Sequence, residues 1–124
     1  MKTETLGSME LDVLTPEEVV QRFDRNDIIL IDVRTPAEYE FEHIPGALLF
    51  PLSRFDPAKL PAQNTKPIVL HCGSGKRSHK AAQRCADAGI EVLAHMEGGF
   101  GEWKKAGLPY VAIDPDTGSL VERP

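Results

Sequence analysis

The sequence predicts an α/β fold, with a central, mostly parallel sheet of about five strands that is flanked by helices on both faces. The apolar runs at residues 28–33 and 68–71 are continuous rather than alternating, which is typical of strands covered on both faces. Thr15-Pro16-Glu17-Glu18 and Thr35-Pro36-Ala37-Glu38 both match the pattern of a capped helix start. Strands and helices therefore alternate along the chain, and this order implies parallel strands joined by right-handed crossovers.

The remaining elements follow from local patterns. Residues 1–10 are polar and lack periodicity, so we expect them to form a flexible lead-in. Short apolar stretches predict an edge strand at 11–14 and further strands at 47–50 and 91–95. Helical patterns predict a turn within 53–60, a helix with a small-residue face at 78–88 and a short helix at 99–106.

One domain accounts for most of the 124 residues, and we place it at residues 11–113, followed by a polar tail or return strand at 114–124. The net charge of −5 gives no overall attraction for nucleic acid or anionic membranes, so we expect neither as a partner. The longest runs uninterrupted by a polar residue, glycine or proline, such as 28–31 and 47–50, have four residues, which is too short for a spanning helix. The first dozen residues contain no signal-peptide core, and we therefore expect a cytoplasmic protein.

The two cysteines, Cys72 and Cys85, lie in different settings. Without a second cysteine pair or clustered histidines they do not match a zinc site, and we expect no metal or other cofactor. A disulfide is compatible with the count, but a cytoplasmic location argues against it. Cys85 falls on the apolar face of the helix at 78–88, where inert packing is the expected role.

Cys72 follows the strand at 68–71 and begins the sequence Cys-Gly-Ser-Gly-Lys-Arg-Ser. The carboxyl ends of parallel strands are where chemistry gathers in α/β sheets. Converging loop amides, the start of the next helix, and the cations Lys76 and Arg77 all favour the thiolate at this position. Such settings lower a cysteine pKa to about 3.5–7.5. We therefore expect Cys72 to be ionised, open to solvent and next to a site for anions.

Four ordered motifs give the chain, over residues 11 to 110, a resemblance to the rhodanese-like sulfurtransferases. The motifs are Ile31-Asp32-Val33-Arg34 with Pro36, Glu38 and Tyr39; His43-Ile44-Pro45-Gly46-Ala47; Cys72 to Ser78; and Gly98-Gly99-Phe100 with Trp103. The second motif departs from the family pattern at Glu42, because the family often has glycine directly before the histidine.

The resemblance implies covalent catalysis in two half-reactions. Cys72 takes sulfane sulfur from a small anionic donor, such as thiosulfate or glutathione persulfide, and passes it to cyanide, a thiol or a protein cysteine. The other expected site residues are the substrate-binding Gly73, Ser74, Gly75, Lys76, Arg77 and Ser78 and the supporting Asp32 and Arg34. Within this set, Arg77 is expected to grip the donor. The residues carry no prediction of oligomeric state.

Two other functions remain open. The chain could be a persulfide carrier or a protein-binding module that turns over inefficiently with small acceptors. It could also be a phosphatase or arsenate reductase, since those relatives share the fold. Only four residues separate Cys72 from Arg77, one fewer than is usual in those relatives, and the resemblance therefore favours sulfur chemistry.

The other polar residues have mainly structural interpretations. Arg34 and Glu38 are spaced to form an ion pair at a helix start. His43 is expected to brace the following turn. His71 and Cys72 are neighbours along a strand, so their side chains should point to opposite faces and not form a catalytic pair. His79 is expected to be exposed.

Overall fold

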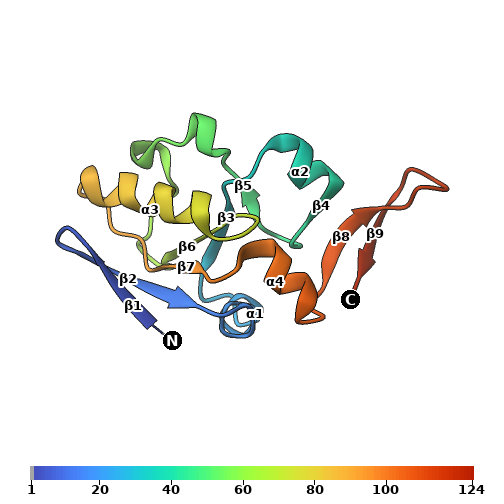
Figure 1. The fold of residues 1–124 in the computed structure, drawn as a ribbon, viewed down its shortest axis with the longest axis horizontal. Helices are drawn as coiled ribbons and strands as arrows, with labels where there is room; N and C mark the ends of the chain where they lie inside the picture. Colours follow the sequence, from blue (N-terminus) through green and yellow to red (C-terminus); the bar gives the residue numbers. More distant parts are fainter. Residues whose placement is uncertain (1) are drawn as a thin grey trace.

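The computed structural model describes residues 2–124, and its main feature is a six-stranded sheet with the order β1-β2-β7-β6-β3-β5 (Figure 1). The strands are β1 (Lys2–Leu6), β2 (Met9–Leu14), β3 (Ile29–Asp32), β5 (Leu48–Leu49), β6 (Ile68–His71) and β7 (Ala94–Met96). Every neighbouring pair is parallel except β1 and β2. The predicted α/β class and mostly parallel sheet are confirmed, with one more strand than expected.

The helices are α1 (Pro16–Asp24), α2 (Pro36–Phe41), α3 (Lys76–Asp87) and α4 (Gly99–Lys105), with short 3-10 helices at Leu52–Arg54 and Pro57–Lys59. Both predicted capped starts are confirmed. Thr15 and Thr35 each accept a hydrogen bond from the backbone N–H three residues later, and the glutamate there bonds back to the cap.

Two hydrophobic clusters cover the two faces of the sheet. On one face, Ala81 and Cys85 of α3 pack with Ile31 and Leu70. On the other face, Val19 of α1 and Trp103 of α4 pack with Leu30 and Val69. Neighbouring residues of β3 and β6 thus point into different clusters, which explains why their sequences are continuously apolar.

The N-terminal residues differ from the prediction, because residues 2–6 form strand β1 rather than a loose lead-in. A turn at Gly7 and Ser8 connects β1 to β2, and Leu6 and Met9 on either side of it are buried. The side chains of Thr3 and Thr5 also donate hydrogen bonds to Asp12 and Glu10 of β2. The strand was missed because it is an edge strand with only one buried apolar residue, and β2 is consequently an interior strand.

The C-terminal residues form β8 (Tyr110–Ile113) and β9 (Leu120–Arg123), which join β4 (Glu42–His43) in a second, antiparallel sheet. Of the two alternatives for residues 114–124, the structure shows the return strand. The strand expected at 91–95 is shifted, since β7 spans Ala94–Met96. No helix in the part of the chain from residue 2 to residue 124 is suited by length and hydrophobicity to crossing a bilayer. The domain limits at residues 11 and 113 stay a prediction.

Candidate active site

Cys72 lies directly after β6, at the carboxyl edge of the sheet, where the chain turns through Gly73–Gly75 into α3. The turn depends on Gly75, whose φ of 108° is in the left-handed region that glycine tolerates. Cys72 belongs to the apolar cluster under α3, together with Leu70. Strand alternation therefore directs the intervening His71 to the opposite face, away from the sulfur, in line with the prediction.

Backbone amides surround the sulfur of Cys72. The N–H of Gly75 donates a hydrogen bond to Sγ over 3.1 Å, and the hydroxyl oxygen of Ser78 lies 3.7 Å from Sγ. Burial alone would raise the pKa of Cys72. Hydrogen bonds from Ser78, Ser74 and Gly75 outweigh this effect and hold the pKa below its ordinary value. The direction agrees with the predicted thiolate.

The predicted exposure of Cys72 is wrong, because its side chain is completely buried. The sulfur lies inside the loop rather than at the mouth of an open pocket. The reason is geometric: the same inward-facing amides that stabilise a thiolate also wrap around it. A donor can reach this sulfur only if part of the loop moves.

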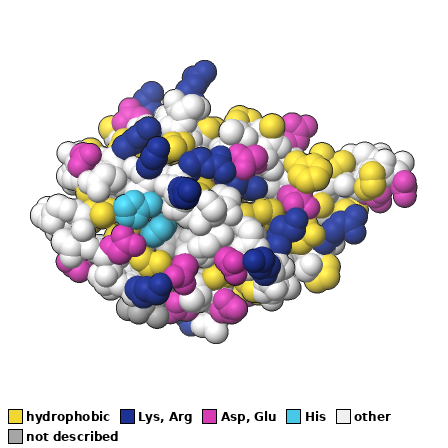
Figure 2. All heavy atoms as spheres, in the orientation of Figure 1, with side chains coloured by type: hydrophobic (Ala, Val, Ile, Leu, Met, Phe, Trp, Pro, Cys, Tyr) yellow, Lys and Arg dark blue, Asp and Glu magenta, His cyan; other side chains and the backbone are white. Residues whose placement is uncertain are grey.

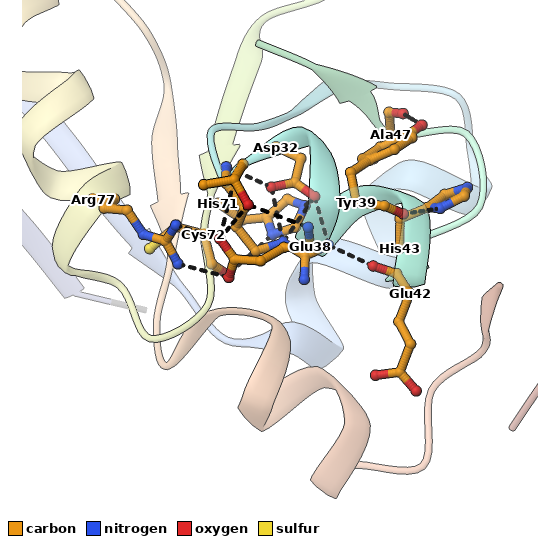
Figure 3. A network of polar contacts seen from close by, with 11 residues as sticks. Asp32, Glu38, Tyr39, Glu42, His43, Ala47, His71, Cys72 and Arg77 are labelled. Atoms are coloured by element: carbon orange, nitrogen blue, oxygen red, sulfur yellow. Dashed lines mark hydrogen bonds and ion pairs between the residues drawn. The ribbon is translucent and has the colours of Figure 1, made fainter. Parts of the chain in front are cut away.

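Arg77 is already paired in the structure. Its guanidinium donates two hydrogen bonds to the carboxylate of Glu38 in α2, over 2.6 and 3.0 Å (Figure 3). This bidentate contact lowers the pKa of Glu38 to about 2. Lys76 and Ser74 are exposed, and Lys76 has no hydrogen bond or ion pair among the described residues. Of the two cations at the start of α3, Lys76 is thus unpaired within residues 2–124 and Arg77 is paired.

The start of α4 holds the loop in this shape. The N–H groups of Phe100 and Gly101 donate hydrogen bonds to the carbonyl oxygens of Cys72 and Gly73, over 2.7 and 3.1 Å. Gly99 permits the contact, since a Cβ there would lie 2.6 Å from the carbonyl carbon of Gly73. With its first carbonyls held by α4, the loop directs the following amides toward the sulfur.

Comparisons with known proteins identify the family. The sequence model of the family described as "Rhodanese-like domain" matches residues 15–106 of this chain. The chain belongs to the rhodanese-like domain family. It is 44% identical over 98 residues to an uncharacterized protein, slr1261, of Synechocystis, and 34% identical over 97 residues to a sulfurtransferase of Allochromatium vinosum. The matched regions cover 79% and 77% of this chain, but 55% of the first relative and 91% of the second.

Solved structures share the fold. A protein from Rhodopseudomonas palustris, described as being of unknown function and a possible tyrosine phosphatase, superposes with a TM-score of 0.67 at 32% sequence identity. The match covers 78% of this chain and 82% of that one. The six-strand sheet with helices on both faces is thus the architecture of its rhodanese-like neighbours.

The first of the four motifs, which begins at Ile31, forms a buried ion pair rather than the one we expected. Arg34 pairs with Asp32, with Nη2 at 2.8 Å from Oδ2, and also donates to the carbonyl oxygen of Glu42 over 2.7 Å. The predicted pair between Arg34 and Glu38 is wrong, because Asp32 at the end of β3 needs a partner inside the protein and Glu38 faces Arg77. Asp32 and Arg34 thereby tie the end of β3 to the chain after α2.

Three histidines near the site have structural contacts. His43 stacks on Tyr39 with ring centroids 4.0 Å apart and bonds through Nδ1 to the Tyr39 carbonyl, so its contacts are with the preceding helix α2 rather than with the following turn (Figure 3). The side chain that spans the turn is Tyr39, whose hydroxyl donates to the carbonyl oxygen of Ala47 over 2.6 Å. Burial lowers the pKa of His71, which lies 3.7 Å from Asp32 at the end of the neighbouring strand. His79 is half-buried rather than exposed and contacts Glu4 of β1 over 2.9 Å.

Cys85 behaves as expected from its place in the core. Its side chain is buried against the sheet, and burial raises its pKa to about 11. The two cysteines are both free and differ in the direction of their pKa shifts. The rhodanese-like domain thus contains one sulfur that favours the thiolate and one that disfavours it.

A cavity of about 650 Å³ borders the active-site loop. It lies between the loop, α3 and the N-terminal hairpin, and its charged and histidine lining residues are Lys2, Glu4, Lys76, His79, Lys80, His95 and Glu97. Figure 2 shows histidine side chains on this face of the molecule, bordered by acidic and basic ones. A second cavity of about 740 Å³ is lined by residues 63–67 and 91–93 and by none of the predicted site residues.

Proposed function

We propose that this chain is a sulfurtransferase that carries sulfane sulfur as a persulfide on Cys72. The observation that carries the proposal is the hydrogen bond from the Gly75 amide to the sulfur, at 3.1 Å, within a loop that lowers the pKa of Cys72. Family membership and a relative named sulfurtransferase support the same reaction class.

The reaction conserves atoms and electrons in two steps. The Cys72 thiolate attacks the sulfane sulfur of the donor, whose S–S bond breaks, and the remainder leaves with the bonding pair as sulfite or a thiolate. A nucleophilic acceptor (cyanide, a thiol or a protein cysteine) then attacks the outer sulfur, and Cys72 leaves as a thiolate. The amides of Gly75, Ser74 and Ser78, which already lower the pKa of Cys72, would hold the anionic sulfur in both steps.

The ion pair of Arg77 links the binding of a donor to the accessibility of the Cys72 sulfur. A donor with an oxyanion or a carboxylate would compete with Glu38 for the guanidinium, since both present oxygen atoms to the same planar fork. Release of Glu38 would free the start of α3, and with it the loop between β6 and α3, to move away from the sulfur. Opening is required because Cys72 is completely buried.

The same burial favours a second candidate, a carrier or protein-binding module with slow turnover. In that case Cys72 would load persulfide, or contact a partner, without efficient transfer to small acceptors. A phosphatase or arsenate reductase is the third candidate, and the short loop from Cys72 to Arg77 argues against it. For the leading candidate, we propose a cytoplasmic location and small-molecule or protein thiols as partners.

The test compares the two cysteines. The protein, Cys72→Ser and the matched control Cys85→Ser are each incubated with thiosulfate and with glutathione persulfide and then analysed by intact mass spectrometry. We expect one added sulfur in the unmodified chain and in Cys85→Ser and none in Cys72→Ser. Sulfur loading that persists in Cys72→Ser, or that fails with both donors, would refute the proposal.

Turnover separates the alternatives. Sustained transfer to cyanide or a thiol, in excess of one sulfur per chain, supports the enzyme. Loading that stops at one sulfur supports the carrier. Hydrolysis of an aryl phosphate that is lost in Cys72→Ser would instead support the phosphatase.

A further inference from the structure

A chain of polar contacts leads from the active-site sulfur to a histidine on the neighbouring strand. The Ser78 hydroxyl lies 3.7 Å from Cys72 Sγ and 3.0 Å from His95 Nδ1. All three side chains are buried, and His95 retains only 6% of its exposure. Because His95 lies opposite Leu70 in the register between β6 and β7, the sheet itself fixes its position.

The hydroxyl of Ser78 has one proton, and three neighbouring groups can accept it. They are Cys72 Sγ, His95 Nδ1 and the carbonyl oxygen of Gly75 at 3.1 Å. If Nδ1 is unprotonated, it competes with the sulfur for the serine proton. If Nδ1 carries a proton, it donates to the serine oxygen, and the serine proton is free to turn to the sulfur. The tautomer of His95 therefore decides in which direction the hydrogen bonds between His95, Ser78 and Cys72 run.

We propose that His95 is a positioning residue whose Nδ1–H holds the Ser78 hydroxyl as a donor to ionised Cys72. The inference rests on the proposed function, because it assigns a task to the thiolate that receives sulfur. A negatively charged sulfur attracts the serine proton more strongly than the neutral Gly75 carbonyl does. When Cys72 is a neutral thiol, it can donate to the Ser78 oxygen, and the Ser78 proton then turns to the carbonyl oxygen of Gly75.

The surroundings of His95 support this tautomer. Burial lowers the pKa of His95, so the ring is neutral near pH 7 and has a single N–H. Its Nε2 is buried and has no hydrogen-bond partner among residues 2–124. A proton on Nε2 would be a donor without an acceptor, a situation that is rare among buried N–H groups. A proton on Nδ1 has the Ser78 oxygen as its acceptor.

Several charges face this chain and affect its titration. Glu4 of β1, His79 of α3 and Glu97 beyond β7 act on His95, and Lys2, Lys76 and Lys80 line the same cavity. Arg77 lies near Cys72 and is paired with Glu38 of α2. The variants described below leave all of these groups in place, so a change in the titration of Cys72 reports on the hydrogen bonds.

The test replaces one ring nitrogen at a time. In His95→Asn the side-chain amide stands where Nδ1 stands, whereas in His95→Gln it stands closer to the place of Nε2. The pKa of Cys72 is measured from thiolate absorbance near 240 nm, with each variant's Cys72→Ala counterpart subtracted. We expect His95→Gln to raise this pKa by about one unit, because a hydrogen bond to a charged group is weakened. His95→Asn should leave it near the original value.

Two further measurements fix the interpretation. In a Ser78→Ala background, His95→Gln should change the Cys72 pKa no further, because the intermediate hydroxyl is absent. In the unmodified chain, ring 15N shifts should place the His95 proton on Nδ1 while Cys72 is ionised, a readout that needs no substitution to fold. A proton on Nε2 in that state, or equal pKa values for the Asn and Gln variants, would overturn the proposal.

The titration of Cys72 can be measured whether or not the protein transfers sulfur, so failure of this proposal and failure of the proposed function are distinguishable. The titration uses no donor, so a chain that fails to load sulfur can still show the coupling between His95 and Cys72. Conversely, a chain that loads sulfur but shows no coupling would retain its function and lose this assignment. For a chain that does both, loading by thiosulfate should follow the Cys72 titration, and its pH profile should shift in His95→Gln by the same amount.

Discussion

Replacing Glu38 with glutamine should reveal how strongly α2 is fastened to the active-site loop. Glutamine retains the hydrogen bonds of the helix cap, because glutamine and glutamate both serve at that position. It removes the charge that faces Arg77 at 2.6 Å, and also one of the two acceptors of the guanidinium, because an amide nitrogen cannot accept a hydrogen bond. The matched control is Glu40→Gln, which changes an exposed glutamate of the same helix.

The magnitude follows from the pKa of Glu38, which is lowered from 4.5 to about 2. Each unit corresponds to about 1.4 kcal/mol, so the shift sets an upper limit of roughly 3.5 kcal/mol for the contribution to stability. The side chains of Arg77 and Glu38 are 35% and 38% exposed, so solvent screens the pair. We therefore expect Glu38→Gln to lower the free energy of unfolding by about 1 kcal/mol near neutral pH.

The pH dependence gives the prediction its sign. A folded-state pKa below the unfolded value means that the contribution is complete above about pH 4.5 and is lost as the pH falls toward 2. Urea unfolding of both proteins across this range should show a stability difference that shrinks as the pH is lowered. A constant difference from neutral pH to about pH 3, or an equal loss in Glu40→Gln, would show that the ion pair is not its cause.

Two further predictions concern the frame of the site. Gly99→Ala should lower the melting temperature more than Gly107→Ala, because both have positive φ values but only at Gly99 would the added Cβ meet backbone atoms of the loop. Equal losses would contradict the proposed close contact. Asp32→Asn should lower the free energy of unfolding by about 3–5 kcal/mol in urea titrations, because it leaves buried Arg34 without its carboxylate. The exposed Asp27→Asn should cost about 0–1 kcal/mol, and a similar cost for both would refute the buried-pair argument.

The sequence was sufficient to predict the α/β class because the signals were local. Continuous apolar runs marked β3 and β6, and the capping patterns marked α1 and α2. Strand β1 gave no such signal, since an edge strand needs few apolar residues. Its stability comes from pairing with β2, a contact that no pattern within residues 2–6 can show.

The same distinction holds for the site. The position of Cys72 and its lowered pKa could be predicted, because strand, loop and helix follow one another in the sequence. The partner of Arg77 could not, because Glu38 is 39 residues away and competes with another predicted pairing. The burial of the sulfur was also missed, since it depends on how closely the loop folds around Sγ. His95 was overlooked because its role depends on a register between strands.

One short segment of the chain acts on the sulfur in two ways. The N–H groups of Phe100 and Gly101 hold the first carbonyls of the loop and so aim its later amides at Cys72. Five residues before Phe100, His95 contacts Ser78 and thereby orients the hydroxyl next to the same sulfur. Backbone and side chain of residues 95–101 thus act from one side, while Glu38 holds Arg77 from another element. A donor that displaces Glu38 would loosen the second restraint, while the N–H groups of Phe100 and Gly101 would still hold the first carbonyls of the loop.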